Sequence, residues 1–109
     1  MKFYCNLYLG ETIEKKRNRL IRRLEKGKIL LGIYVIVLPL GENNQLEIFD
    51  SGMLMQKHFH REERFVVGIA SGFDEALDLT VRITEEVYRK TGGAGLKEYI
   101  LNEEQRKNL

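Results

Sequence analysis

A change of hydrophobic period between residues 65 and 90 constrains the fold of this chain more than any other feature. In residues 65–70 both alternating sets of positions are apolar or small, which is typical of a strand buried on both faces. In residues 74–90 the apolar side chains instead recur at helical spacing, with charged side chains opposite them. The stretch therefore predicts an inner strand, a tight turn at Ser71-Gly72 and a long helix packed against a core.

The predicted helix has a defined direction. Asp74 and Glu75 lie in its first turn and Arg89 and Lys90 in its last, which matches the helix dipole. The predicted core-facing stripe consists of Phe73, Ala76, Leu77, Thr80, Ile83, Thr84, Val87 and Tyr88.

The rest of the chain alternates between the same two patterns. Residues 2–9 form a strand pattern with one aliphatic face and one tyrosine face, and residues 12–26 form a helical pattern with Thr12 as the expected N-cap. Residues 30–38 and 45–50 predict two strands joined by a hairpin loop of roughly four residues. Residues 51–63 are compatible with a short helix, a strand continuation or a covering loop.

The order of these elements is strand, helix, three strands and helix. We therefore expect an α+β fold: a two-layer sandwich in which a mixed four-stranded sheet carries both helices on one face. Residues 1–101 form the predicted single domain, and the polar residues 102–109 form a C-terminal tail.

Length and composition predict a cytoplasmic protein without cofactors. A chain of 109 residues can bury a core without a metal or a disulfide, and its single cysteine, Cys5, cannot form an intrachain bridge. No secretory signal pattern is visible, and the apolar run of residues 29–40 is shorter than the ~20 residues of a membrane helix. We expect no membrane partner.

Two helices on one face leave the other face of the sheet without cover. That second face is expected to present Tyr4, Tyr8, Tyr34 and Phe49. Because large exposed apolar patches mark interaction surfaces, the sequence predicts a homodimer, or an apolar ligand or partner, on this face. The alternative is that the segment from Met53 to Phe59 covers it.

The first helix carries the strongest charge feature in the chain. Its basic stripe comprises Lys15, Lys16, Arg19, Arg22, Arg23 and Lys26. Residues 11–28 have a net charge of +5, whereas the whole chain has +2, so the remainder is net negative. Phosphate contact, and hence nucleic-acid binding, is the alternative function that this stripe indicates. The absence of aromatic or amide readers and the negative remainder argue against it.

Signals for metal binding and catalysis are weak. His58 and His60 have a spacing that metal sites use when the segment is extended, but no specific zinc motif surrounds them, and we predict no metal. Residues 68–72 precede a helix as phosphate loops do, yet they lack the lysine and the glycine pattern of such loops. The sequence has no catalytic motif, and an enzyme whose site is assembled across the fold is the second alternative.

The run Val66-Val67-Gly68-Ile69-Ala70-Ser71-Gly72-Phe73-Asp74-Glu75-Ala76-Leu77, with residues 88–93 closing the helix, resembles small uncharacterised bacterial proteins of the clostridial type. The similarity extends over much of the chain. It implies a bacterial cytoplasmic setting and assigns no activity, cofactor or residue role. Taken together, the patterns predict a self-associating binding or assembly module without catalysis.

Overall fold

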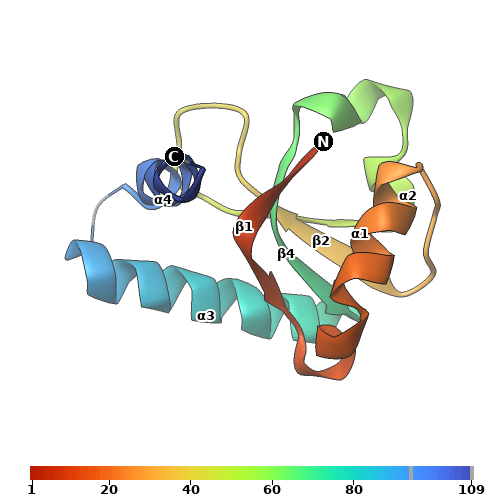
Figure 1. Cartoon of the computed structure of the whole chain (residues 1–109), viewed down its shortest axis with the longest axis horizontal. Helices are drawn as coiled ribbons and strands as arrows, with labels where there is room; N and C mark the ends of the chain where they lie inside the picture. The colour runs from red at the N-terminus through yellow and green to blue at the C-terminus, as the bar shows by residue number, and fades with distance from the viewer. Residues whose placement is uncertain (94, 109) are drawn as a thin grey trace.

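The computed structural model describes residues 1–93 and 95–108. Its centre is a four-stranded mixed sheet with the strand order β1-β4-β2-β3 (Figure 1). The strands are β1 (Lys2–Leu9), β2 (Ile33–Val37), β3 (Glu47–Asp50) and β4 (Phe65–Ser71). β1 runs parallel to β4, whereas β2 runs antiparallel to both β4 and β3. The predicted α+β class and mixed four-stranded sheet are therefore confirmed.

Helices and helical turns fill the connections between the strands. They are η1 (Glu11–Lys16), α1 (Arg17–Glu25), α2 (Ser51–Leu54), η2 (Lys57–Phe59), η3 (Arg61–Glu63), α3 (Phe73–Thr91) and α4 (Leu96–Lys107), where η marks a 3-10 helix. Residues 51–63, whose sequence left three possibilities open, thus form one short α-helix and two 3-10 turns. No helix of the described residues is both long and apolar enough to cross a bilayer.

α1 and α3 lie on opposite faces of the sheet, so the expected two-layer sandwich with both helices on one face is wrong. Leu20 and Leu24 of α1 belong to a core with Val35 of β2, whereas Ile83 of α3 belongs to a second core with Ile36. Neighbouring strand residues point to opposite faces. Figure 1 shows α1 and α2 on one side of the strands and α3 and α4 on the other. The physical reason is that both inner strands are apolar on both faces, and each face needs a helical cover.

The parallel edge of the sheet has an irregular register. Phe3 pairs with Val66 and Tyr8 pairs with Gly68, so residues 4–7 of β1 stand opposite the single residue 67 of β4. The bulge leaves backbone groups of β1 without partners in the sheet. One of them, the N–H of Cys5, donates to Oε1 of Glu104 in α4 at 2.6 Å.

The C-terminal segment is a docked helix rather than the predicted polar tail. Leu96 and Ile100 of α4 are buried in the same core as α3, and the helix continues to Lys107 with Glu104 bonded to β1. One of the polar residues of this helix, Glu104, supplies the acceptor for the N–H of Cys5 in the bulged strand, and this bond stabilises the helix beyond residue 101. Residue 109, the last of the predicted tail, lies outside the described residues.

Candidate functional site

The tyrosines expected on an exposed sheet face lie in the core beneath α3 and α4. Tyr4 is only 3% exposed, and its ring stacks on that of Tyr8 with the centroids 6.4 Å apart. Tyr34 is half-buried, and its ring meets the edge of Phe73 at 5.8 Å. The chain itself covers this face, which contradicts the predicted interaction surface.

Phe49, the fourth residue of that prediction, lies on the opposite face. It pairs across the hairpin with Val35, and paired residues share a face of the sheet. Its ring contacts Phe59 at 4.8 Å between centroids, and the Arg64 guanidinium lies 5.3 Å from its centroid. Segment 53–59 therefore does cover part of the sheet, together with α1, but on the side away from the tyrosines.

The environment of the two stacked tyrosines favours the neutral phenol. Burial raises the pKa of Tyr8, and the nearby carboxylate of Glu86 raises it further. Burial likewise raises the pKa of Tyr4. Both side chains thus serve packing.

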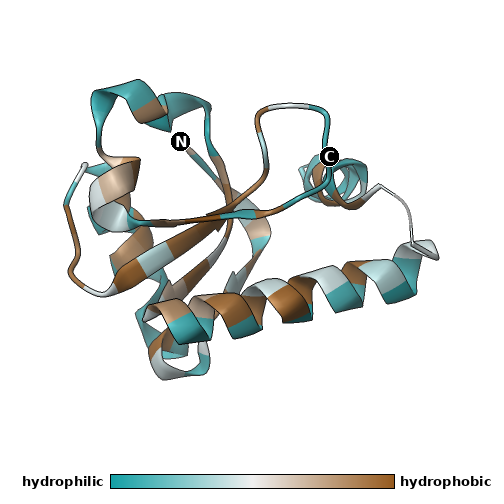
Figure 2. Cartoon of the chain, turned by 180° about the vertical axis from the view of Figure 1, so that it is seen from behind, coloured by the Kyte–Doolittle hydropathy of each residue, from teal (hydrophilic) through white to brown (hydrophobic). Residues whose placement is uncertain are grey.

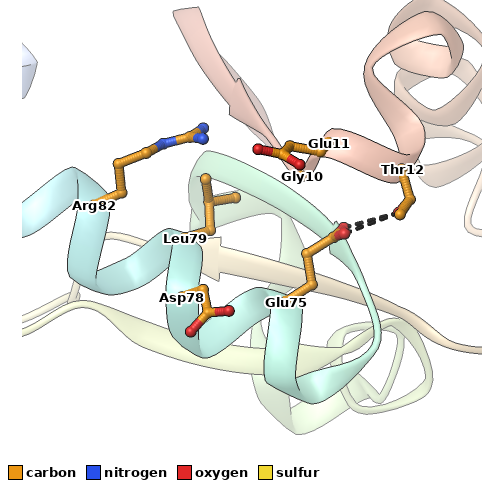
Figure 3. A pocket seen from close by; sticks show the side chains of 7 residues that line it. All are labelled: Gly10, Glu11, Thr12, Glu75, Asp78, Leu79 and Arg82. Carbon is orange, nitrogen blue, oxygen red and sulfur yellow. Dashed lines mark hydrogen bonds between the residues drawn. The ribbon is translucent and has the colours of Figure 1, made fainter.

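A polar crevice opens at the carboxyl ends of β1 and β4 (Figure 3). The chain leaves β1 toward α1 on one face and leaves β4 toward α3 on the other. Parallel strands whose connections diverge in this way create a common location for ligand sites in α/β proteins. The crevice has a volume of about 460 Å³ and is lined by Gly10, Glu11, Thr12, Glu75, Asp78, Leu79 and Arg82.

Three polar side chains of this crevice, those of Thr12, Glu75 and Arg82, form hydrogen bonds within the chain. Oε1 of Glu75 accepts from the backbone N–H of Ser71 at 2.8 Å, and the Thr12 hydroxyl donates to the same carboxylate at 2.9 and 3.1 Å. Arg82 donates to the carbonyl of Leu9 at 3.3 Å. Glu75 thus links the first turn of α3 to the last residue of β4, and its bonds with Thr12 fasten η1 to α3. Thr12 has this role instead of the expected N-cap role.

Of the two candidate metal-binding histidines, His58 lies in η2 and His60 links η2 to η3, so the segment between them is not extended. His58 packs beside the ring of Phe59 at 5.2 Å, and His60 has a left-handed backbone conformation with φ 53°. Among residues 1–93 and 95–108, no group of three or more metal-ligating side chains has suitable geometry.

The predicted basic stripe follows the outer side of η1 and α1. All six side chains are exposed. Three of them, Lys16, Arg19 and Arg23, share a hollow of about 470 Å³ with Ile29 and Leu31 of the following turn. The sequence predicted the charges but gave no sign of the apolar side chains beside them.

A long exposed apolar surface lies along α3, and we call it the α3 flank. It comprises Phe73, Leu77, Thr80, Val81, Thr84, Tyr88 and Thr91, which occupy an arc of about 100° of the helix and carry no charge. Its four large side chains, at positions 73, 77, 81 and 88, are between 43% and 63% exposed. Figure 2 shows hydrophobic residues recurring along the length of this helix.

The sequence assigned part of this flank to the core. Phe73, Leu77 and Tyr88 belonged to the predicted core-facing stripe, whereas the residues that are buried include Leu79, which it omitted. The sequence did contain a sign that α3 has two apolar surfaces, one facing the core and one exposed. When Leu79 and Val81 are included, the apolar positions of α3 occupy a wider arc of the helix than can be buried against one sheet.

The two sides of α3 differ in chemistry. The side toward β1 is charged: Glu75 bonds Thr12, Arg82 bonds Leu9, and Glu86 lies beside Tyr8. The α3 flank lies on the other side, toward β2, where Phe73 contacts Tyr34. The charged side is therefore used within the chain, and the uncharged flank faces outward.

Comparison of the chain with protein-family models, with curated proteins and with solved structures found no match. The resemblance to clostridial-type proteins stays a prediction.

Proposed function

We propose that this chain is a self-associating binding or assembly module, and that it forms a homodimer by packing the α3 flanks of two copies together. The observation that supports the proposal is the exposure of four large apolar side chains along one uncharged side of a 19-residue helix. Burial of such a surface against an identical one removes apolar area from water on both copies.

The size of the flank sets the expected strength of the dimer. The helix is about 28 Å long, and the four large side chains leave on the order of 350–400 Å² in contact with water. That is the size of the largest apolar patch on a typical monomer. Two flanks and their polar surroundings would bury on the order of 1,000 Å² in total, which is the lower end for a specific interface. We therefore expect a dimer with a micromolar dissociation constant.

Charge complementarity favours an antiparallel pair of helices. Asp74 lies in the first turn of α3 next to the flank, and Arg89 lies in its last turn, where it lines a hollow with Thr84 and Tyr88 of the flank. In an antiparallel pair the acidic start of one helix lies beside the basic end of the other, and the helix dipoles also oppose each other. A parallel pair would instead bring like charges together.

The antiparallel arrangement also brings residues of the two flanks into compatible contacts. Val81 lies midway along the length of the flank, at the edge of its arc, and would sit close to the two-fold axis. Phe73 at one end would lie near Tyr88 of the second copy, which allows an aromatic contact. Thr80 and Thr84 are small enough to let two helices approach to about 8–10 Å.

Sedimentation equilibrium over a range of protein concentrations tests the proposal. The wild-type chain should shift from monomer to dimer in the micromolar range, and Val81→Glu should abolish the dimer because it places two carboxylates at the axis. Leu101→Glu is the matched control, since Leu101 is 40% exposed on α4, away from the flank, and it should leave the dimer intact.

Two results would overturn the proposal. The first is a wild-type chain that stays monomeric at several hundred micromolar. The second is a dimer that survives Val81→Glu. Thermal unfolding of both variants separates loss of association from loss of the fold, because substitutions at exposed helix positions change stability by about 0.5 kcal/mol or less in most proteins.

A further inference from the structure

Two apolar side chains of the turn between α1 and β2 are exposed to solvent. Leu31 is 97% exposed and Ile29 is 63% exposed, whereas Leu30 between them is buried. Both backbone groups of Leu30 bond the hydroxyl of Ser51: the N–H donates to Oγ at 2.8 Å, and the carbonyl accepts from it at 2.7 Å. Ser51 is itself 1% exposed. The turn is thus anchored with Leu30 inward and its two neighbours outward.

Basic side chains surround these two apolar side chains. Lys16, Arg19 and Arg23 line the same hollow as Ile29 and Leu31. Their helix cannot turn its apolar side outward, because Leu20 and Leu24 are buried in the core under the sheet. The salt bridges found among residues 1–93 and 95–108 all involve other side chains. The hollow therefore combines positive charge with exposed hydrocarbon.

We propose that this surface docks on an anionic lipid bilayer. Ile29 and Leu31 would enter the boundary between headgroups and acyl chains, while Lys16, Arg19 and Arg23 contact the lipid phosphates. Peripheral binding of this kind depends on buried apolar area together with attraction between basic residues and acidic lipids. This proposal revises the expectation of no membrane partner, which was based on the absence of a membrane-spanning run, because a contact with the bilayer surface needs no such run. The contact uses the side of the sheet opposite to the α3 flank.

The apolar pair favours lipid over nucleic acid as the occupant. A phosphate backbone attracts the basic side chains equally well but offers no apolar phase for Leu31. A bilayer interface provides both the negative charge and the hydrocarbon. The combination of the two chemistries at one hollow therefore distinguishes this proposal from the nucleic-acid alternative that the basic stripe indicates by itself.

Vesicle co-sedimentation tests the proposal, with phosphatidylcholine vesicles that either contain or lack phosphatidylserine. Wild-type protein should bind the vesicles that contain phosphatidylserine, and the binding should weaken as salt rises. Arg19→Glu with Arg23→Glu should weaken it more than tenfold, since each basic residue near an anionic surface contributes roughly a fivefold factor. Lys57→Glu with Lys107→Glu changes the net charge equally at exposed positions elsewhere and should have a much smaller effect.

A second set of variants tests the contribution of the apolar side chains to vesicle binding. Leu31→Ser should weaken binding by about tenfold, whereas Leu101→Ser, at an exposed leucine of α4, should not. The chain has no tryptophan, so Leu31→Trp introduces a single fluorescent reporter. Its emission should shift to the blue on vesicles with phosphatidylserine, and that of Leu101→Trp should stay unchanged.

Three results would overturn the proposal. They are failure to bind phosphatidylserine vesicles at low salt, equal binding to pure phosphatidylcholine, and full binding by Leu31→Ser. If duplex DNA binds with loss in the Arg19→Glu, Arg23→Glu variant but no loss in Leu31→Ser, the surface belongs to a nucleic-acid site instead. Val81→Glu should retain vesicle binding as a monomer, so failure of the dimer and failure of this site are separable.

Discussion

Glu104 links the C-terminal helix to the bulge of β1. Its carboxylate accepts from the N–H of Cys5 at 2.6 Å and from the Asn108 side chain at 2.9 Å. Partial burial alone would raise the pKa of Glu104, but these hydrogen bonds outweigh burial, and the pKa is lowered overall. Burial and the same carboxylate raise the pKa of the Cys5 thiol. The charged form of Glu104 is therefore the form that stabilises the fold.

Replacement of this carboxylate should make the fold less stable. Glu104→Ala leaves the N–H of Cys5 without its acceptor, and we expect a loss of about 1–2 kcal/mol in the free energy of unfolding. Glu104→Gln keeps an acceptor oxygen and should lose less. Urea unfolding near neutral pH measures both, and equal stability of all three proteins would show that the bond contributes nothing.

The pH dependence of this effect has a definite sign. Because the folded state lowers the pKa of Glu104, its stabilisation is complete above the pKa of the unfolded chain, near 4.5, and is lost as the pH falls through the lower folded value. The stability difference between wild type and Glu104→Gln should thus shrink on acidification below about pH 5. Thermal melts of the two proteins from neutral to acidic pH provide the test, and a constant difference would contradict it.

Gly10 shows how close η1 lies to α3. A Cβ at this position would overlap the carboxylate of Glu75, although the backbone φ of −61° suits alanine. Gly10→Ala should therefore displace Glu75 from Ser71 and Thr12 and lower the free energy of unfolding by about 1–3 kcal/mol. In a Glu75→Ala background the same substitution should cost much less, and a double-mutant cycle from urea unfolding measures that coupling. Additive effects would contradict the steric cause.

At the scale of elements, α4 is the main departure from the expected order. Leu96 and Ile100 are buried, while Leu101 next to them is 40% exposed. Ile100→Ala should lower the free energy of unfolding by about 2–5 kcal/mol because it opens a cavity beside α3. Leu101→Ala should lower it by less than about 1 kcal/mol. Thermal unfolding distinguishes this helix from a frayed segment, in which both substitutions would have equally small effects.

Much of the element pattern could be predicted from local periodicity. The inner strand, the turn at Gly72 and the helix that follows were readable because apolar spacing changes from two to 3.6 residues there. Which residues of β1 point to each face of the sheet could not be predicted in this way. Phe3 and Leu7 face α1, whereas Cys5 turns to the other core with Tyr4, because the bulge breaks the alternation between them. No residue in that stretch marks a bulge.

At the scale of the whole molecule, the prediction that both helices cover the same face of the sheet was wrong. The apolar residues on both faces of the two inner strands were visible in the sequence, and they require a helical cover on each face. We expected a second copy to supply the missing cover, but α1 with α2 covers one face and α3 with α4 covers the other. The surfaces left exposed are therefore the outer sides of helices and turns, which depend on tertiary packing and could not be read from periodicity.

Self-association through the α3 flank is the central claim about the whole molecule. An antiparallel pair brings position 81 of one copy close to position 81 of the other, within the 7 Å between Cα atoms that a disulfide allows. Position 86 lies on the charged side of the same helix, away from the flank. Since Cys5 is the single cysteine, a Cys5→Ser background leaves one thiol at the position chosen.

The most direct test is therefore oxidative cross-linking of Val81→Cys in that background, with Glu86→Cys as the matched control. We expect Val81→Cys to form a disulfide-linked dimer rapidly at micromolar concentration, and Glu86→Cys to remain largely monomeric. Equal cross-linking of the two variants, or none in either at concentrations where sedimentation detects a dimer, would contradict association through the α3 flank.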